Sequence, residues 1–230
     1  MDLWGALILV GFFLVFGLLV FAAYYSSRKD KEEKRRVWQQ LGFTAIEADA
    51  LLAEKISSLY QREGISNRYE LRNISRKAIL DGEMFLFDLV ETSGEDDSWT
   101  ERQAVAIVSS YLNLPQFVLF PKVDEKYILS GIANRVVEWG MSKIGSPVEI
   151  PEFPGLDSRY IITSNDAEAL RRFLDESLSH YFANTQMVRI HAAGDIFTSC
   201  ELISNFKTGD LVSMTQRVDR AMDIFRLFLK

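Results

Sequence analysis

One acidic residue of the sequence lies inside an otherwise apolar stretch. Asp88 is the only charged residue of segment 85–90 (FLFDLV), which has the composition of a buried strand. Burial would raise the pKa of such a carboxyl group and suit it to acid–base chemistry. The alternative is a structural ion pair, for which Arg102 and Arg76 on neighbouring strands are the candidate partners. Asp88 and Arg102 are therefore the candidate ligand-binding residues, and no catalytic set is predicted.

A cysteine nucleophile that is activated by a histidine base requires the two side chains to be in contact. Cys200 and His191 are the candidate pair in this sequence. A hairpin that turns at residues 193–194 places Ile196 opposite His191 and Met187 opposite Cys200. The thiol and the imidazole are then several residues apart along the strands. We expect Cys200 to be an ordinary, partly buried residue.

Metal and phosphate chemistry lacks the residues that it requires. The chain has two histidines and one cysteine, too few for a zinc site without several carboxylates. The acidic segment 93–98 lacks the glycine-centred alternation of a calcium loop. No phosphate loop or dinucleotide-binding motif occurs in the sequence. We therefore expect no metal and no cofactor.

Residues 3–25 form an unbroken apolar run. A helix of this length, at about 1.5 Å per residue, reaches roughly 34 Å and crosses a hydrocarbon core about 30 Å thick. The run has no basic residue before it and does not end in a small-x-small cleavage site, so it does not resemble a signal peptide. It ends at Tyr24 and Tyr25, a pair typical of the membrane interface. These features predict a retained single span, with the lipid bilayer as its partner.

Basic residues on one side of the span predict its orientation. Segment 28–36 holds six basic and three acidic residues, beginning with Arg28 and Lys29, and no basic residue precedes the span. The positive-inside rule places the N-terminus outside an inner (plasma) membrane and the C-terminal part in the cytoplasm. The cluster could hold the domain against anionic lipid. The alternative is a solvated helix whose charges pair four residues apart, such as Asp30 with Lys34.

The charge of the chain argues against nucleic acid as a partner. The net charge is −6, and because the first 36 residues hold six basic and four acidic side chains, the remainder carries −8. Such a body repels phosphate backbones, and no basic stripe with interleaved aromatic residues offsets that repulsion. The single cysteine is typical of a cytosolic domain.

Helical periodicity predicts four helices after the span and its flank. The first opens on a capping box formed by Thr44 and Glu47. The second carries Trp139, which either packs in the core or enters the membrane interface. The third begins at an N-cap followed by an acidic first turn. The expected ranges are about 44–62, 125–144, 165–182 and 210–229.

Seven strands are expected, several of them joined by hairpins. The first hairpin turns at Asp81 and Gly82, a dipeptide that favours a type I′ turn. Strand 100–109 is apolar on most of both faces, which predicts a central position. Pro151 and Pro154 predict that the segment after the second helix is extended. The expected ranges are 69–80, 83–91, 100–109, 116–120, 159–163, 186–192 and 195–203.

Runs of strands separated from helices indicate an α+β fold, with a mainly antiparallel sheet of about seven strands packed with about four helices. A pleckstrin-homology-like barrel is the alternative, and the helix expected between the fifth and sixth strands argues against it. The predicted division is a transmembrane helix at 1–25, a basic juxtamembrane helix or linker at 26–43, and a cytoplasmic α+β domain at 44–230.

Short motifs follow one another over roughly residues 70–175: Phe87-Asp88, 102–105 (RQAV), 114–117 (LPQF) with Pro121, and Phe153 followed by Tyr160. In their order and spacing they resemble a widespread set of uncharacterised bacterial proteins, which have one N-terminal span and a cytoplasmic α+β domain. The resemblance implies this architecture. It implies no activity and no catalytic residues.

Two hypotheses for function follow. The first is a membrane-tethered cytoplasmic domain that binds another protein or serves as a scaffold, since the chain combines a tether and a well-patterned core with no chemical signature. The second is a membrane-proximal enzyme or lipid-contacting domain that uses Asp88 and Arg102. The sequence favours the first and names no substrate or partner.

Overall fold

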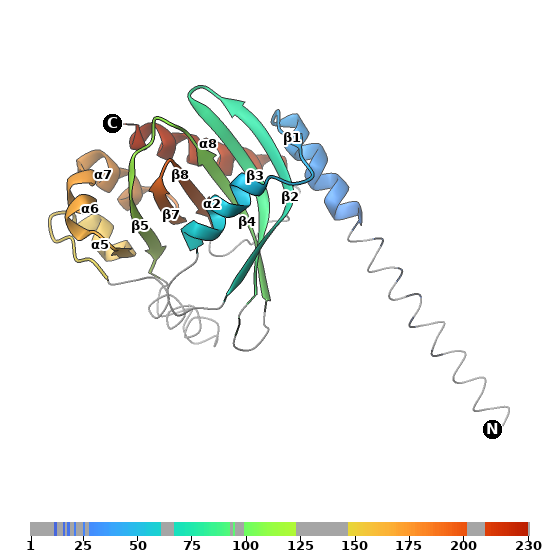
Figure 1. The fold of residues 1–230 in the computed structure, drawn as a ribbon, viewed down its shortest axis with the longest axis horizontal. Coiled ribbons are helices and arrows are strands. Elements are labelled where there is room, and N and C mark those ends of the chain that lie inside the picture. The colour runs from blue at the N-terminus through green and yellow to red at the C-terminus, as the bar shows by residue number, and fades with distance from the viewer. Residues whose placement is uncertain are drawn as a thin grey trace.

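The computed structural model describes residues 12, 16, 18, 21, 25, 28–60, 67–92, 94, 99–122, 147–201 and 210–229 (Figure 1). They form an α+β fold with one eight-stranded sheet in which every pairing of neighbours is antiparallel. The α+β class and the mainly antiparallel sheet are therefore confirmed. The eighth strand is β1 (Thr44–Ala45), at the start of what we predicted to be a helix.

The strands do not follow one another across the sheet in sequence order. Their order is β1-β2-β3-β4-β8-β7-β5-β6, so the C-terminal hairpin β7-β8 lies between β4 and β5. The predicted central position of the strand near 100–109 is confirmed, because β4 has β3 and β8 as neighbours. The remaining bounds are β2 (Arg68–Ile79), β3 (Gly82–Thr92), β4 (Trp99–Val108), β5 (Leu114–Pro121), β6 (Tyr160–Ser164), β7 (Arg189–Gly194) and β8 (Ile196–Cys200).

The turn between β2 and β3 differs from the predicted type I′ turn at Asp81 and Gly82. Ile79 pairs with Gly82, so the two central residues are Leu80 and Asp81. Asp81 has a φ of 72°, whereas Gly82 does not have a positive φ. A Cβ atom at Gly82 would lie 2.5 Å from the carbonyl oxygen of Val108. Glycine is therefore required here by the close approach of β4 and not by the turn.

The turn of the β7-β8 hairpin lies one residue later in the sequence than we predicted. His191 lies opposite Thr198, and Arg189 lies opposite Cys200. The predicted pairs of His191 with Ile196 and of Cys200 with Met187 are wrong. The reason is that the chain reverses at Gly194, where φ is 58°, one residue later than expected.

The first helix of the domain is α2 (Ala50–Tyr60), and it begins later than predicted. The capping box is wrong, because Thr44 belongs to β1 and pairs with Arg76 of β2. Asp49 caps the helix instead, its Oδ1 accepting a hydrogen bond of 2.9 Å from the amide of Leu52. Pairing with the sheet has overridden a favourable local signal.

Within the described residues 147–188, which precede β7, there are three short helices, α5 (Pro154–Arg159), α6 (Ala167–Phe173) and α7 (Glu176–Asn184). The segment predicted to be extended contains α5, in which Pro154 occupies the first turn, where no amide donor is needed. The N-cap of α6 is confirmed, since Asp166 accepts a bond from the amide of Ala169. The predicted single helix is broken because Asp175 caps a second one.

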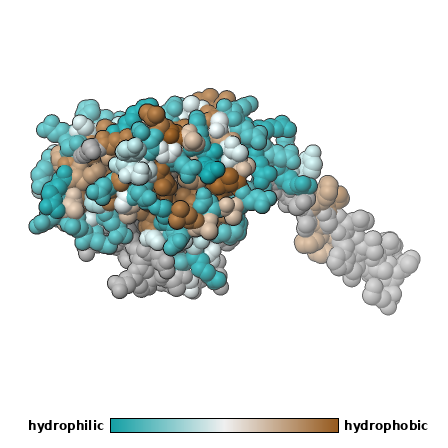
Figure 2. Space-filling view, turned by 45° about the horizontal axis from the view of Figure 1, so that its top comes forward, coloured by the Kyte–Doolittle hydropathy of each residue, from teal (hydrophilic) through white to brown (hydrophobic). Residues whose placement is uncertain are grey.

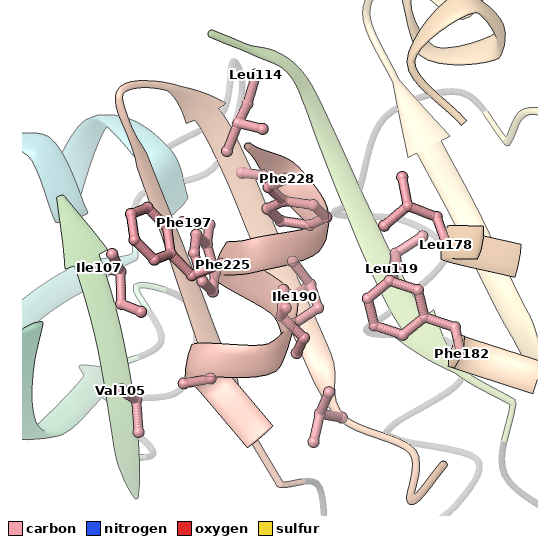
Figure 3. Close-up of a cluster of buried hydrophobic side chains, with 14 of the residues drawn as sticks. Val105, Ile107, Leu114, Leu119, Leu178, Phe182, Ile190, Phe197, Phe225 and Phe228 are labelled. Atoms are coloured by element: carbon pink, nitrogen blue, oxygen red, sulfur yellow. The ribbon is translucent and has the colours of Figure 1, made fainter. Parts of the chain in front are cut away.

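Helices cover both faces of the sheet. The C-terminal helix α8 (Leu211–Phe228) packs on one face, and α2 packs on the other (Figure 1). Figure 3 shows Phe197 of β8 facing Phe225 and Phe228 of α8 across the larger core. As predicted, α8 is a C-terminal amphipathic helix, and it is capped by Asp210.

Two predictions lie wholly or mainly outside the described residues. These are the helix at 125–144, with Trp139, and most of the apolar segment 3–25, including Tyr24. Within the described part of the chain, no helix has both the length and the apolar character needed to cross a membrane.

Candidate functional site

The carboxylate of Asp88 is buried and held by two partners. Its side chain projects from β3 and the residue is 1% exposed. The Nζ atom of Lys34 lies 3.0 Å from Oδ1 and 2.9 Å from Oδ2. The side-chain amide of Asn73 donates to Oδ2 at 2.7 Å. Asn73 lies in a bulge of β2 with a φ of 51°, and both oxygens of Asp88 are occupied by these contacts.

Arg102 and Asp88 are not brought together. In the β3-β4 register Asp88 lies opposite Gln103, and Arg102 lies opposite Leu89. Because successive side chains of a strand alternate between faces, Arg102 projects from the face opposite to that of Asp88. Its Nη1 lies 3.6 Å from the buried carboxylate of Glu91. The predicted Asp88–Arg102 pair is therefore wrong.

Arg76, the other predicted partner, is also engaged elsewhere. Its Nη1 lies 3.4 Å from Glu83, and both side chains are nearly half exposed. The partner of Asp88 instead comes from the helix at residues 28–40, which the sequence suggested to be a solvated flank of the span. The predicted pairing of Lys34 with Asp30 is replaced by this contact with the sheet.

The helix at 28–40 rests on the sheet through one stripe. Lys34, Val37, Trp38 and Leu41 are the covered positions, with spacings of three, one and three that place them on one side of a helix. Trp38 is 1% exposed and belongs, with Val37, to the same core as α8. Arg28 and Lys29 are exposed, and their predicted place at a membrane interface stays a prediction.

A second contact holds the end of this helix. Lys77 of β2 donates a hydrogen bond of 2.8 Å to the carbonyl oxygen of Leu41. The same ammonium group lies 5.6 Å from the centre of the Phe43 ring, which is buried. Together Lys34, Trp38, Asn73 and Asp88 form what we call the helix-docking site. The segment at 26–43, expected to be a basic juxtamembrane helix or linker, thus contributes directly to the core of the domain through Trp38.

A polar network continues from the helix-docking site toward α8. Gln103, opposite Asp88, accepts a hydrogen bond from Arg217. Arg217 and Arg220 both pair with the buried carboxylate of Glu201, at 2.9 and 3.0 Å. These residues were not predicted from the sequence. The arginines follow the spacing of the buried face of α8, which is the signal that could have identified them.

The opposite face of the sheet holds a second buried polar group. The ring of Tyr60 at the end of α2 stacks on His191, with ring centres 4.1 Å apart, and its hydroxyl lies 2.8 Å from the Oγ1 of Thr198. Arg189 Nε donates to His191 Nε2 at 2.7 Å. Cys200 is a diagonal neighbour of His191 in the hairpin and is 5% exposed. These contacts join α2 to the sheet, and the buried thiol serves as a packing residue.

Burial raises the pKa of tyrosines on this and neighbouring surfaces. The pKa of Tyr69 rises to about 12 through burial and the nearby Glu91 carboxylate, and that of Tyr60 is also raised by burial. The folded state therefore favours the neutral phenols. The contribution of these tyrosines to the free energy of unfolding is fully present below the unfolded-state pKa of about 10. It is lost as pH rises through their folded-state pKa values.

We expect the free energy of unfolding to fall between about pH 10 and pH 12, and the decline to be shallower in a Tyr69→Phe variant. Urea denaturation of the detergent-solubilised chain at a series of pH values measures this. The matched control is Tyr111→Phe, because Tyr111 is 68% exposed. Equal slopes in the two variants would contradict the assignment of Tyr69.

No protein family, no characterised protein and no solved structure matches the chain. The resemblance to uncharacterised bacterial membrane proteins stays a prediction.

Proposed function

We propose that this protein is a membrane-tethered binding or scaffold domain, anchored by residues 3–25 as a single span in the inner membrane of a bacterium, with its α+β domain in the cytoplasm. The observation that carries the proposal is the helix-docking site, which attaches the segment after the apolar run to the core of the domain by Trp38 and by the Lys34–Asp88 ion pair.

The described residues of the apolar run support an anchoring role. Residues 12, 16, 18, 21 and 25 are all helical, and their side chains are between 55% and 67% exposed. Figure 2 shows hydrophobic residues, coloured brown, beyond the hydrophilic surface at the N-terminal side of the domain. A row of exposed apolar side chains is unfavourable in water and is the normal surface of a helix in lipid.

Docking of the helix would fix the domain relative to the membrane. Lys34 follows Tyr25 by nine residues, which is about 14 Å along a helix. The domain would therefore sit close to the lipid headgroups in one orientation and would present the same surface to its partners. A flexible linker would allow many orientations, so a docked helix suits a scaffold.

The positions of Asp88 and Arg102 do not favour the alternative of an enzyme or lipid-contacting domain that uses both residues. The two side chains project from opposite faces of the sheet, and the Asp88 carboxylate already binds Lys34 and Asn73. A carboxylate held in this way has a structural role.

The test has two stages that can fail separately. The full chain with a C-terminal tag should remain in carbonate-washed membranes, and a chain without residues 3–25 should be released. In intact spheroplasts the tag should resist external protease. Release of the full chain, or cleavage of the tag, would contradict the anchor or its orientation.

The second stage asks whether the domain binds a protein. Cross-linking in cells, followed by purification through the tag, should enrich the same partner for the full chain and for a chain whose residues 3–25 are replaced by an unrelated span. The control is the unrelated span alone with the tag. Enrichment no greater than with this control would contradict a binding function.

A further inference from the structure

Among the described residues, β1 pairs with the outer edge of β2 over only a short part of its length. β1 pairs with Ser75 and Arg76 and with no other residue of β2. Over residues 68–73, no strand within the described part of the chain pairs with this edge, which lies on the side of β2 away from β3 (Figure 1). Unpaired backbone groups on such an edge are a template for another strand.

The pairing with β1 fixes which backbone groups point outward. The amide of Ile46 donates a hydrogen bond of 2.9 Å to the carbonyl oxygen of Ile74. The backbone N–H and C=O groups of Ile74 therefore point toward β1. Backbone N–H and C=O groups alternate in direction along a strand. Those of Ser75 therefore point toward β3, where Ser75 lies opposite Leu86.

The alternation continues past the bulge. Arg72 lies opposite Asp88, two residues along β3 from Leu86, and so it also faces β3. Tyr69 and Leu71 then direct their N–H and C=O groups outward. The exposed edge thus offers hydrogen-bonding groups at alternate residues, as a further antiparallel strand requires.

The side chains that flank Leu71 carry opposite charges. Glu70 and Arg72 project to the same face of β2, and their side chains are 61% and 49% exposed. The two are joined within the strand by hydrogen bonds of 2.8 and 2.7 Å. An exposed pair of this kind contributes little to stability, and its members are available to other partners.

We propose that the edge of β2 at residues 68–73 binds the same edge of a second copy of this chain, related by a two-fold axis through Leu71. Antiparallel pairing about this axis places Glu70 of each copy opposite Arg72 of the other, and opposite charges across a strand pair are favourable. The outward backbone groups of Leu71 would form hydrogen bonds with those of Leu71 in the other copy. Tyr69 of each copy would lie opposite Asn73 of the other.

Other registers are less favourable. Residues opposite one another must project to the same face, so the axis must pass through a residue and not between two. An axis at Glu70 opposes two carboxylates and also places Arg68 opposite Arg72. An axis at Tyr69 pairs Arg68 with Glu70 but leaves only residues 68–70 in the paired segment, because β2 begins at Arg68.

Edge strands commonly carry charges that prevent pairing between identical copies. In β2 the order Glu70-Leu71-Arg72 converts this repulsion into attraction, because each charge meets its opposite under the two-fold axis. The axis is perpendicular to the sheet, so the two helices at residues 28–40 lie on the same side of the joined sheet. The inference does not depend on the membrane anchor.

The first test is disulfide trapping of the full chain. In a Cys200→Ser background, Leu71→Cys should form a disulfide-linked dimer under mild oxidation. Cα atoms of a hydrogen-bonded antiparallel pair are about 5.5 Å apart, within disulfide range. The control is Leu80→Cys, which is 85% exposed at the turn of the same hairpin. Cross-linking at residue 71 no stronger than at residue 80 would overturn the proposal.

The second test exchanges the charges. Glu70→Arg and Arg72→Glu, each alone in the Leu71→Cys, Cys200→Ser chain, place like charges opposite one another at two symmetric positions. Each should slow dimer trapping by about tenfold or more. The double exchange Glu70→Arg with Arg72→Glu should restore it, while circular dichroism confirms that all variants are folded. Failure of the double exchange to restore trapping would overturn the two-fold register.

Discussion

Replacing Trp38 by alanine is expected to reduce the free energy of unfolding by about 3–5 kcal/mol, the range for removal of a large core side chain. The indole is 1% exposed and packs in the core shared by α8 and the sheet. Its loss removes apolar contacts and leaves a cavity beneath the helix at 28–40. Urea denaturation of the full chain in detergent, followed by far-ultraviolet circular dichroism, measures the change.

Trp38→Phe separates packing from hydrogen bonding at this position. The Nε1 of Trp38 is buried without a hydrogen-bond partner among the described residues. Phenylalanine retains much of the ring and removes this unpaired donor, so its cost should be clearly smaller than that of alanine. Leu51→Ala is the surface control, since Leu51 is 64% exposed. If alanine and phenylalanine cost the same, the helix does not dock through this ring.

The Lys34–Asp88 ion pair is expected to show a large effect of single substitutions and a small effect of their combination. Breaking a buried pair costs about 3–5 kcal/mol, because one charge is left without its partner. Lys34→Met should be the more damaging change, since the Asp88 side chain is 2% exposed. Asp88→Leu should cost less, because the Lys34 side chain is 12% exposed and can turn toward water.

The double variant Lys34→Met, Asp88→Leu should recover most of the lost stability, since a buried pair can often be replaced by apolar residues of similar size. The same urea experiment gives the coupling between the two sites. Arg226→Met is the matched control, because Arg226 and Asp223 form a pair in which the side chains are 68% and 50% exposed. Additive losses in the double variant would show that the two side chains do not interact.

The sequence was most informative where local interactions decide the structure. The cap at Asp166 was predictable because a carboxylate and the amides of the next helical turn are close in the chain. The central position of β4 was predictable because its residues are apolar on both faces. The pattern of apolar residues and the helix-capping residues were sufficient to predict these elements.

Predictions failed where distant parts of the chain compete with local signals. Thr44 and Glu47 make a good capping box, yet Thr44 pairs with Arg76 of β2. The hairpin register failed for a different reason, because a change of one residue in the turn moves every cross-strand pair.

The helix-docking site was hidden by distance in sequence. Lys34 and Asp88 are 54 residues apart, and no local rule connects them. One signal was present: Lys34 shares a helical stripe with Val37, Trp38 and Leu41, which places a basic residue on an apolar face. The buried Asp88 needed a cation, and this stripe offered one. The register between β3 and β4, which excludes Arg102 as the partner of Asp88, could not be predicted from the sequence.

The strand order sets limits on how the chain folds during synthesis. β4 and β5 are consecutive in sequence, yet each acquires its second neighbour in the sheet only when the β7-β8 hairpin arrives, because β4 pairs first with β3 and β5 with β6. A nascent chain that ends before residue 189 therefore exposes one edge of β4 and one of β5, as well as the apolar face that α8 covers later. Such intermediates are prone to aggregation. The domain is therefore expected to complete its fold only after nearly the whole chain has left the ribosome.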